Sequence, residues 1–366
     1  MMKVLVVFGT RPEAIKMCPL VLALSKAEDI NCQVCVTAQH RSMLDQVLEI
    51  FQVSPDYDLD IMQPRQTLAS ITTAVLNGME GVLQRSAPDV VLVHGDTTTS
   101  MSAALAAFYA QIPVAHVEAG LRTYNRYSPF PEEMNRKIIS ALATCHFAPT
   151  EGNREALRQE GIATQVYVTG NTVIDAFRYT LSWNYLFHNP VLRAHSFSQR
   201  TILMTAHRRE NLGRPLENIC HAVRVLCERH PELSFIYPVH LNPAVRDTVF
   251  ALLENQCQVL LIDPIDVEDM HNALSRSYLV LTDSGGLQEE APHLGKPVIV
   301  LRTETERPEA VAAGTVVVAG VETEAIVNTV EELLNNTERY QAMSQAINPY
   351  GDGHASERIV SLLQKL

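Results

Sequence analysis

The sequence predicts an α/β protein built from two Rossmann-like domains that face each other across a cleft. Short β-branched runs alternate with longer helical patterns along the chain, as in parallel sheets with right-handed crossovers. This alternation restarts near residue 201, and a chain of 366 residues exceeds one ordinary core. We therefore expect a first domain at residues 1–169, completed by a final helix at 354–366, and a second domain at residues 170–353.

The composition is acidic, with 41 Asp and Glu against 29 Lys and Arg and a formal net charge of −12. This charge argues against a nucleic-acid partner or an anionic membrane surface. The start of the sequence lacks a cleavable leader pattern, and no apolar run is long enough to span a bilayer. We expect a soluble, cytoplasmic protein in which any anionic ligand is bound by a local group of basic residues.

The sequence has seven cysteines, scattered through apolar runs, which is typical of reduced core thiols. Cys32 and Cys35 form a lone CxxC pattern with neither a second pair nor histidines at metal-binding spacing. The sequence also contains no Walker A loop. We expect no metal site.

The first half begins with a strand at residues 3–8 that leads directly into a helix. Thr10 and Glu13 have the spacing of a capping box, and Pro12 lies in the first turn, where its missing N–H costs nothing. This helix is expected to end at Ser25. The other expected strands are residues 34–37, 89–93, 113–117 and 166–169; the other expected helices are residues 43–51, 67–86 and 134–144, and residues 56–62 are expected to be irregular.

Charged residues follow several of these strands. Arg11 and Lys16 lie in and near the first turn of a helix, where positive charge opposes the helix dipole and so favours a bound anion; a solvated basic turn is the alternative. Asp96 and Glu118 follow the strands that end at residues 93 and 117. One such acid alone is more often a cap or a loop partner. Ligands of parallel sheets bind beyond the carboxyl ends of the strands, so Arg11, Asp96 and Glu118 together favour a ligand site.

A rigid segment, residues 128–133, enters the helix at 134–144. Its acidic residues, Glu132 among them, suit the helix dipole whether or not they have a catalytic role. Residues 170–171, Gly-Asn, are the expected hinge between the domains. Residues 183–200 show little periodicity and are interpreted as a linker or a surface loop.

The second half restarts with a strand at residues 201–206. His207 lies at the exit of this strand, as Arg11 does in the first half, and two arginines follow it. In an acidic protein this cluster favours an anion site, although a satisfied loop histidine is the alternative. Further strands are expected at residues 234–237, 259–262, 278–281 and 298–301, and helices at 216–228 and 354–366.

Residues 284–286, Ser-Gly-Gly, connect a strand to a short helix at 287–294 that contains Pro292. A capping serine followed by glycines leaves backbone N–H groups open to an anion such as phosphate. Glu289 and Glu290 lie in the first turns, where a carboxylate can reach ribose hydroxyls. Alternatively, these residues only cap, turn and favour the helix dipole. Combined with the carboxylates and basic residues of the first half, the pattern favours a nucleotide sugar as ligand.

Eleven motifs in the same order resemble the bacterial non-hydrolysing UDP-N-acetylglucosamine 2-epimerases, over essentially the whole chain. The resemblance implies the GT-B type fold of one large class of glycosyltransferases, a final helix that crosses back to the first domain, a homodimer, and no nicotinamide cofactor or metal. The motifs are GTRPEAIKM, TAQHRSMLDQ, HGDTTTS, HVEAGLRT, SPFPEEMNR, GNTVIDA, AHRREN, YPVHLNP, LTDSGGLQEEAPHLGKPV, TERPEA and NPYGDG.

The resemblance also implies roles for individual residues. The catalytic set consists of Asp96, Glu118, Glu132, His207 and Lys16. The UDP-binding set consists of Arg11, His207, Ile265, Met270, Ser284, Gly285, Gly286, Glu290 and Arg307. Met270 stands where many relatives have an aromatic residue that covers the uracil. An activating site for a second UDP-N-acetylglucosamine is implied at Gln39, His40 and Arg65, although Ser42 stands where a glutamine is expected.

The implied reaction interconverts UDP-N-acetylglucosamine and UDP-N-acetylmannosamine. The C2 hydrogen has no neighbouring carbonyl to acidify it, so UDP must leave C1 before the C2 proton is removed and a glucal-like intermediate forms. Cations and backbone N–H groups stabilise the leaving diphosphate, and carboxylates serve as base and acid on opposite faces. The product would supply N-acetylmannosamine units for cell-envelope polysaccharide. A hydrolysing epimerase, a GT-B glycosyltransferase and a catalytically inactive sensor are the alternatives.

Overall fold

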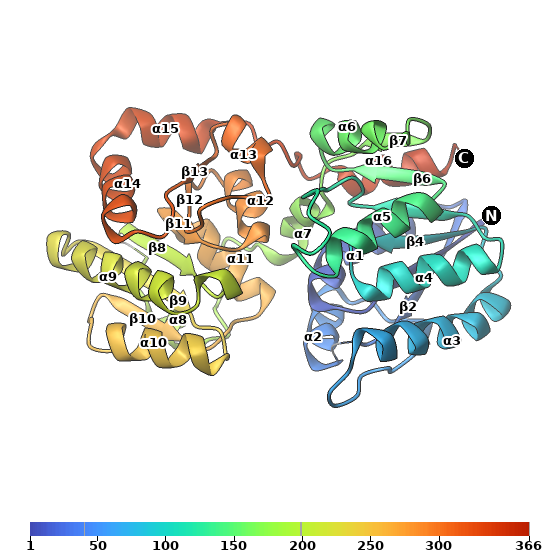
Figure 1. Ribbon diagram of the computed structural model, residues 1–366, viewed down its shortest axis with the longest axis horizontal. Coiled ribbons are helices and arrows are strands. Elements are labelled where there is room, and N and C mark those ends of the chain that lie inside the picture. The colour runs from blue at the N-terminus through green and yellow to red at the C-terminus, as the bar shows by residue number, and fades with distance from the viewer. Residues whose placement is uncertain (40, 198–199, 366) are drawn as a thin grey trace. The chain divides into compact units, whose positions relative to one another are not determined.

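The structure is a computed structural model that describes residues 1–39, 41–197 and 200–365. The chain divides into two compact units (Figure 1). The first unit comprises Met1–Tyr179 together with the chain from Tyr350 onward, and the second comprises Thr180–Pro349. Each unit contains one parallel sheet with helices, so the predicted α/β class with two Rossmann-like sheets is confirmed.

The first unit has a seven-stranded parallel sheet in the order β3-β2-β1-β4-β5-β6-β7. The order reverses between β1 and β4, which are hydrogen-bonded neighbours. At such a switch point a crevice opens beyond the carboxyl ends of the strands. The strands are β1 (Met2–Phe8), β2 (Ile30–Val36), β3 (Tyr57–Asp58), β4 (Val90–His94), β5 (Val114–Val117), β6 (Cys145–Ala148) and β7 (Val166–Val168).

Helices cover both faces of this sheet, because alternate residues of β1 are buried in two separate cores. Val4 and Val6 pack with α1, α2 and α16, whereas Leu5 and Val7 pack with α3 and α4. The helices of the unit are α1 (Arg11–Leu24), α2 (Arg41–Phe51), α3 (Leu68–Ser86), α4 (Thr98–Tyr109), α5 (Glu132–Leu142), α6 (Glu151–Gln159), α7 (Thr172–Thr180) and α16 (Ala355–Leu363).

The first unit extends beyond the expected boundary at residue 169 because α7 packs within it. Ala176 belongs to the core shared with α1 and α16. The carboxylate of Asp175 accepts the backbone N–H groups of Ala355 (3.2 Å) and Ser356 (2.8 Å), which joins α7 to the start of α16. The chain thus returns to the first unit in its final helix.

The second unit has a six-stranded parallel sheet in the order β10-β9-β8-β11-β12-β13, with its switch point between β8 and β11. Its strands are β8 (Arg200–Thr205), β9 (Leu233–Pro238), β10 (Val259–Ile262), β11 (Leu279–Thr282), β12 (Val298–Val300) and β13 (Val316–Val318). Its helices are α8 (Pro190–Ala194), the 3-10 turn η1 (Arg209–Asn211), α9 (Arg214–Arg229), α10 (Pro243–Leu253), α11 (Val267–Arg276), α12 (Gly285–His293), α13 (Pro308–Ala312), α14 (Thr323–Asn335) and α15 (Thr337–Gln345).

Two expected irregular segments contain short regular elements. Residues 56–62 include the two-residue strand β3, which pairs with the end of β2. Residues 183–200 include α8, where the Asn189 side chain caps the helix by accepting the backbone N–H of Val191 at 2.9 Å. Both elements are shorter than the window in which periodicity can be detected. Among the described residues, no helix is both long enough and apolar enough to cross a membrane.

Candidate active site

The turn after β1 is fixed by the buried carboxylate of Glu13. Its Oε2 accepts the backbone N–H groups of Gly9 (3.0 Å) and Thr10 (2.8 Å), and its Oε1 accepts the hydroxyls of Thr97 (2.6 Å) and Ser100 (2.8 Å). The predicted return bond from Glu13 to the cap residue is therefore present. The same carboxylate also joins the turn after β1 to the turn after β4, which the sequence did not predict.

Glu118 follows β5 and is surrounded by donors that converge on one of its oxygens. Oε2 forms an ion pair with Lys16, accepts the Nδ2–H of Asn171 at 2.9 Å, and lies 3.4 Å from Nε2 of His94. Burial raises the pKa of Glu118, but the charge of Lys16 and the interaction with His94 outweigh it and hold that pKa well below its usual range. The carboxylate is therefore ionised at neutral pH.

The backbone at Glu118 is also unusual, with a left-handed φ of +60°. A residue other than glycine pays on the order of 1–3 kcal/mol for such a conformation, and this strain is typical of functional sites. A Cβ placed at Gly95 would lie 3.6 Å from Oε1 of Glu118, so Glu118 lies beside the residue that precedes Asp96. The turns after β4 and β5 therefore bring the two predicted acids close together.

Asp96 is bound by Arg136 of α5. Its Oδ2 accepts Nε–H at 2.9 Å and lies 2.6 Å from Nη2 of that guanidinium. Arg136 also pairs with the fully buried Glu133 at 3.3 Å, and Glu133 accepts the backbone N–H groups of Thr123 (2.9 Å) and Tyr124 (3.1 Å). Glu133 thus braces a loop and an arginine, and Arg136 orients Asp96.

Glu132 is the first residue of α5 and is partly buried. The same helix provides both groups that hold Asp96, because the Nδ2–H of Asn135 donates to the Asp96 carbonyl at 2.8 Å and Arg136 binds its carboxylate. Glu132 therefore begins the helix that positions Asp96. The next residue, Glu133, would suit the helix dipole equally well. Its carboxylate is instead buried, where it binds Arg136 and the backbone N–H groups of the loop at residues 123–124.

The other predicted residues of the first unit differ in their surroundings. Arg11 is the first residue of α1 and is half-buried. The amide oxygen of Gln39 accepts the hydroxyl of Thr99 at 3.0 Å, whereas Arg65 is exposed with φ +61°. His40, the third residue of the predicted activating site, lies outside the described residues. The activating site stays a prediction.

In the second unit the turn after β8 is organised by Asp283, a fully buried residue that the sequence analysis did not single out. Its Oδ2 accepts the backbone N–H groups of His207 (2.7 Å) and Arg208 (2.8 Å) and the side-chain amide of Asn211 (3.1 Å). Its Oδ1 lies 3.4 Å from Nδ1 of His207. Because Asp283 follows β11, it joins the turns on both sides of the switch point.

The imidazole of His207 stacks on that of His240, with ring centroids 5.4 Å apart and an angle of 5° between the planes. Burial lowers the pKa of His207, and the carboxylate of Asp283 opposes this shift while His240 adds to it. The net direction is downward, which favours the neutral imidazole at neutral pH.

The turn at residues 284–286 opens α12. Ser284 is the cap residue, with extended backbone, and its side chain makes no capping hydrogen bond. A Cβ placed at Gly285 would lie 3.5 Å from a guanidinium nitrogen of Arg307 and 3.7 Å from one of Arg208. Two cationic groups and a helix N-terminus thus meet at Gly285. This combination suits an anion such as phosphate.

The two glutamates of α12 have separate surroundings. Glu289 is buried and forms an ion pair with Arg307, so its carboxylate is a structural partner and the interpretation of Glu289 as a ribose ligand is wrong. Oε2 of Glu290 lies 3.4 Å from Nε2 of His271. Glu290 is partly exposed and remains the predicted ligand of this pair.

The predicted uracil-binding segment leads into α11, which is capped by the side chain of Asp266. Met270 lies on this helix and is half-buried, while the side chain of Ile265 is buried at 6% exposure. Met270 therefore retains exposed side-chain surface, whereas Ile265 does not. The contacts of Ile265 and Met270 with uracil stay predictions.

His188, Asp266 and Asp269 form a cluster with potential metal ligands. Asp269 already accepts the backbone N–H groups of His188 and Asn189, both at 2.8 Å, and the hydroxyl of Tyr185 at 2.9 Å. Asp266 accepts from His188 Nδ1 at 2.8 Å. These bonds join α11 to residues 185–189, which accounts for the cluster as a structural brace.

The environment of the CxxC pair, Cys32 and Cys35, disfavours the reactive thiolate form. Burial raises the pKa of Cys32 and of Cys35 to about 12, so both thiols are protonated at neutral pH. A thiol in this state is a poor nucleophile and a poor metal ligand. All seven cysteines are unpaired.

Comparisons with known proteins agree with the motifs. The family described as UDP-N-acetylglucosamine 2-epimerase matches residues 22–364. The chain belongs to this family. A putative family member from Thermotoga maritima is 59% identical over 364 residues, covering 99% of this chain and 96% of that relative. UDP-N-acetylglucosamine 2-epimerase of Escherichia coli K12 is 52% identical over 377 residues, covering 99% and 98%.

Solved structures of the family are also similar to this chain. The Neisseria meningitidis enzyme bound to UDP-GlcNAc is 50% identical, with a TM-score of 0.92 and complete coverage of both chains. The family resemblance predicted from the motifs is therefore confirmed. Sequence reasoning missed Asn171, His94, Arg136 and Asp283 as partners of site residues, although all four lie within motifs that carried the resemblance.

Proposed function

We propose that the protein interconverts UDP-N-acetylglucosamine and UDP-N-acetylmannosamine by eliminating UDP and adding it back. The observation that carries this mechanism is the pair of carboxylates beyond β4 and β5. Glu118 is held ionised by Lys16, and Asp96 is oriented by Arg136. Two oriented carboxyl groups suit proton removal and proton return at one carbon, one as the base and the other, once protonated, as the acid.

In the proposed elimination, the C1–O bond breaks and its electron pair leaves with UDP. A carboxylate takes the C2 proton, and the C2–H electron pair forms the C1–C2 double bond of a glucal. Re-addition of UDP at C1 and of a proton at C2 from the opposite face gives the epimer. We assign proton removal and return to Glu118, Asp96 and Glu132, without fixing which face each one serves.

The residues around the start of α12 are the proposed site for the diphosphate. The N–H groups at Gly285 and Gly286 and the guanidinium groups of Arg208 and Arg307 would stabilise the negative charge of the leaving UDP. His207 lies on the turn that Asp283 joins to the same helix start. A neutral imidazole there can donate one hydrogen bond to a phosphate oxygen.

Product analysis with UDP-N-acetylglucosamine as the sole substrate tests the proposal. The proposed epimerase gives a mixture of the two UDP sugars that is reached from either side. A hydrolysing epimerase would instead release free N-acetylmannosamine and UDP in equal amounts. A glycosyltransferase without an acceptor, or a sensor, would leave the substrate unchanged, and either result would overturn the proposal.

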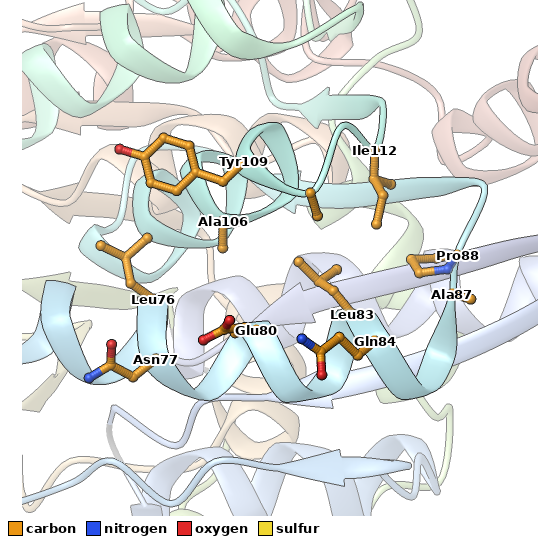
Figure 2. A pocket seen from close by; sticks show the side chains of 11 residues that line it. Leu76, Asn77, Glu80, Leu83, Gln84, Ala87, Pro88, Ala106, Tyr109 and Ile112 are labelled. Atoms are coloured by element: carbon orange, nitrogen blue, oxygen red, sulfur yellow. The ribbon is translucent and has the colours of Figure 1, made fainter.

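We further propose that the protein is a homodimer and that a groove between α3 and α4 contributes to its interface (Figure 2). The groove encloses about 860 Å³, and Leu76, Leu83 and Ile112 are among its lining residues. Phe108 and Tyr109, at the end of α4, are 54% and 70% exposed. Exposed aromatic residues beside a partly apolar groove are typical of protein interfaces, and a second copy would cover both at once.

Sedimentation equilibrium tests this assembly, with an expected mass of twice the chain mass of 40.7 kDa. Tyr109→Glu should shift the protein toward the monomer, whereas Trp183→Glu, at another exposed aromatic residue, should not. A monomeric wild type, or a Tyr109→Glu variant that dimerises normally, would contradict the assignment.

In the cell, we propose that the enzyme acts in the cytoplasm and supplies N-acetylmannosamine units for envelope polysaccharide, whose mannosamine content should fall when the gene is deleted.

A further inference from the structure

Asn171 connects the proposed catalytic carboxylate to the segments that join the two units. It is buried, at 3% exposure, immediately before α7. Its Nδ2–H donates to Oε2 of Glu118 at 2.9 Å, its Oδ1 accepts the backbone N–H of Val173 at 3.1 Å, and its own N–H donates to the carbonyl of Tyr350 at 2.7 Å. One residue thus contacts the carboxylate, the start of α7 and the returning chain.

These contacts lie at the start of α7, the last helix before the chain leaves the first unit, and at Tyr350, where the chain returns to it. The chain leaves the first unit after Tyr179, at the end of α7, and re-enters it at Tyr350. The backbones are packed closely there: a Cβ at Gly170 would lie 3.3 Å from the Tyr350 carbonyl oxygen, and one at Gly351 would lie 3.2 Å from the Gly170 Cα. At such distances the two backbone segments have little freedom to shift separately.

The hydrogen bonds to Glu118 are asymmetric. Lys16, Asn171 and His94 all approach Oε2, whereas Oε1 accepts no hydrogen bond within the described part of the chain. An amide held at both ends, by Val173 and by Glu118, fixes the rotation of the carboxylate. Oε1 is thereby left as the oxygen that can exchange a proton with a bound sugar.

We propose that Asn171 is a positioning residue that fixes the Glu118 carboxylate for proton transfer and links its orientation to the two segments joining the units. The inference rests on the proposed function of Glu118 as a proton carrier. Asn171 does not itself contact the reacting atoms in this account. A shift of either connecting segment would change the geometry of the carboxylate through this amide.

Two variants separate the hydrogen bond from packing. Asn171→Ala removes the amide, while Asn171→Asp keeps its shape and the acceptor for Val173 but replaces the donor with a negative charge beside Glu118. Both variants lose a hydrogen bond to the charged carboxylate of Glu118. Because such a bond contributes more free energy than a neutral one, kcat should fall about 10- to 100-fold in either variant. The KM for UDP-N-acetylglucosamine should stay within about twofold, because the diphosphate site is untouched.

The pH dependence of kcat distinguishes loss of the hydrogen bond from loss of packing, because loss of packing alone would not shift it. Lys16 of α1 and His94 of β4 face Glu118 and are unchanged in both variants. Losing the donor destabilises the ionised form, so the acidic limb of kcat should move upward by about one to two pH units, and further in Asn171→Asp than in Asn171→Ala. Carbon NMR of labelled glutamate carboxyls, assigned with Glu118→Gln, gives the same pKa without turnover.

Asp175→Asn is the matched control, because Asp175 joins α7 to the start of α16 without contacting Glu118. It should leave kcat within about threefold of wild type and the acidic limb unshifted. Equal effects in Asp175→Asn and Asn171→Ala would overturn the proposal, as would an Asn171→Asp variant whose Glu118 titrates as in wild type. A wild type without epimerase activity would instead refute the proposed function, and the NMR titration would still decide the role of Asn171.

Discussion

Replacing Glu13 should disturb both the stability of the first unit and its activity. This carboxylate accepts two backbone N–H groups from the turn after β1 and two hydroxyls from the start of α4. Glu13→Gln preserves the shape but halves the acceptor capacity and removes the charge. Glu13→Ala removes all four acceptor contacts.

The expected magnitudes follow from these contacts. In Glu13→Ala, the buried N–H groups of Gly9 and Thr10 lose their acceptor at about 1–3 kcal/mol each, so the first unit should lose roughly 2–6 kcal/mol. In Glu13→Gln, the amide oxygen can still serve these N–H groups and the two hydroxyls can rotate to accept from the amide. Exchanging charged for neutral hydrogen bonds should then cost about 1–2 kcal/mol.

Hydrogen exchange read by mass spectrometry measures this loss within the first unit, because peptides from α1 and α4 report on it without the second unit. Glu13→Ala should also lower kcat by on the order of tenfold or more, since the turns that carry Arg11 and Asp96 lose their common anchor; Glu13→Gln, which keeps these contacts, should lower kcat less. Glu49→Ala is the control, at an exposed residue of α2. If Glu13→Ala destabilised these peptides by no more than the roughly 0.5 kcal/mol typical of surface changes, the anchoring role would be refuted.

Two further predictions concern the binding of UDP and its sugars. Met270→Phe should hold or improve UDP affinity if Met270 lies beside the uracil, because base–aromatic stacking is worth about 1–3 kcal/mol; calorimetry in which UDP and inorganic pyrophosphate lose affinity equally would remove Met270 from the base site. If the activating site exists, a little UDP-N-acetylglucosamine should accelerate the reverse reaction from UDP-N-acetylmannosamine, and Arg65→Ala should abolish that acceleration. Reverse rates that ignore the addition would exclude the site.

Many of the strands and helices, including those that carry the site, could be predicted from the sequence because they have a local signal, whereas the short elements β3, β6, β13 and α8 were not predicted. The apolar runs at residues 3–8 and 89–93 and the capping pattern of Thr10 and Glu13 are read within a few residues. The same alternation places Arg11, Asp96 and Glu118 at strand ends, since carboxyl ends of parallel strands share one edge. The site residues on these turns therefore follow from the pattern.

The partners of these residues could not be predicted, because they come from distant parts of the chain. Asn171 reaches Glu118 across 53 positions, and Asp283 reaches His207 across 76. The local sequence pattern also cannot tell which of two adjacent acidic residues is buried. Glu289 is buried in an ion pair with Arg307, while its neighbour Glu290 remains partly exposed. For the same reason, the sequence could not show that Glu133 and not Glu132 is the fully buried acid at the start of α5. Nor could it show that α7 packs in the first unit, which decides where that unit ends.

The most direct test of the mechanism is the fate of the C2 hydrogen in heavy water. Elimination predicts deuterium at C2 of UDP-N-acetylmannosamine and also of recovered UDP-N-acetylglucosamine, with traces of free UDP from escaped intermediate. Glu118→Gln should slow this exchange while retaining most UDP binding, because the lost proton carrier acts on the transition state. Epimerisation without any deuterium at C2 would contradict elimination and favour a hydride route.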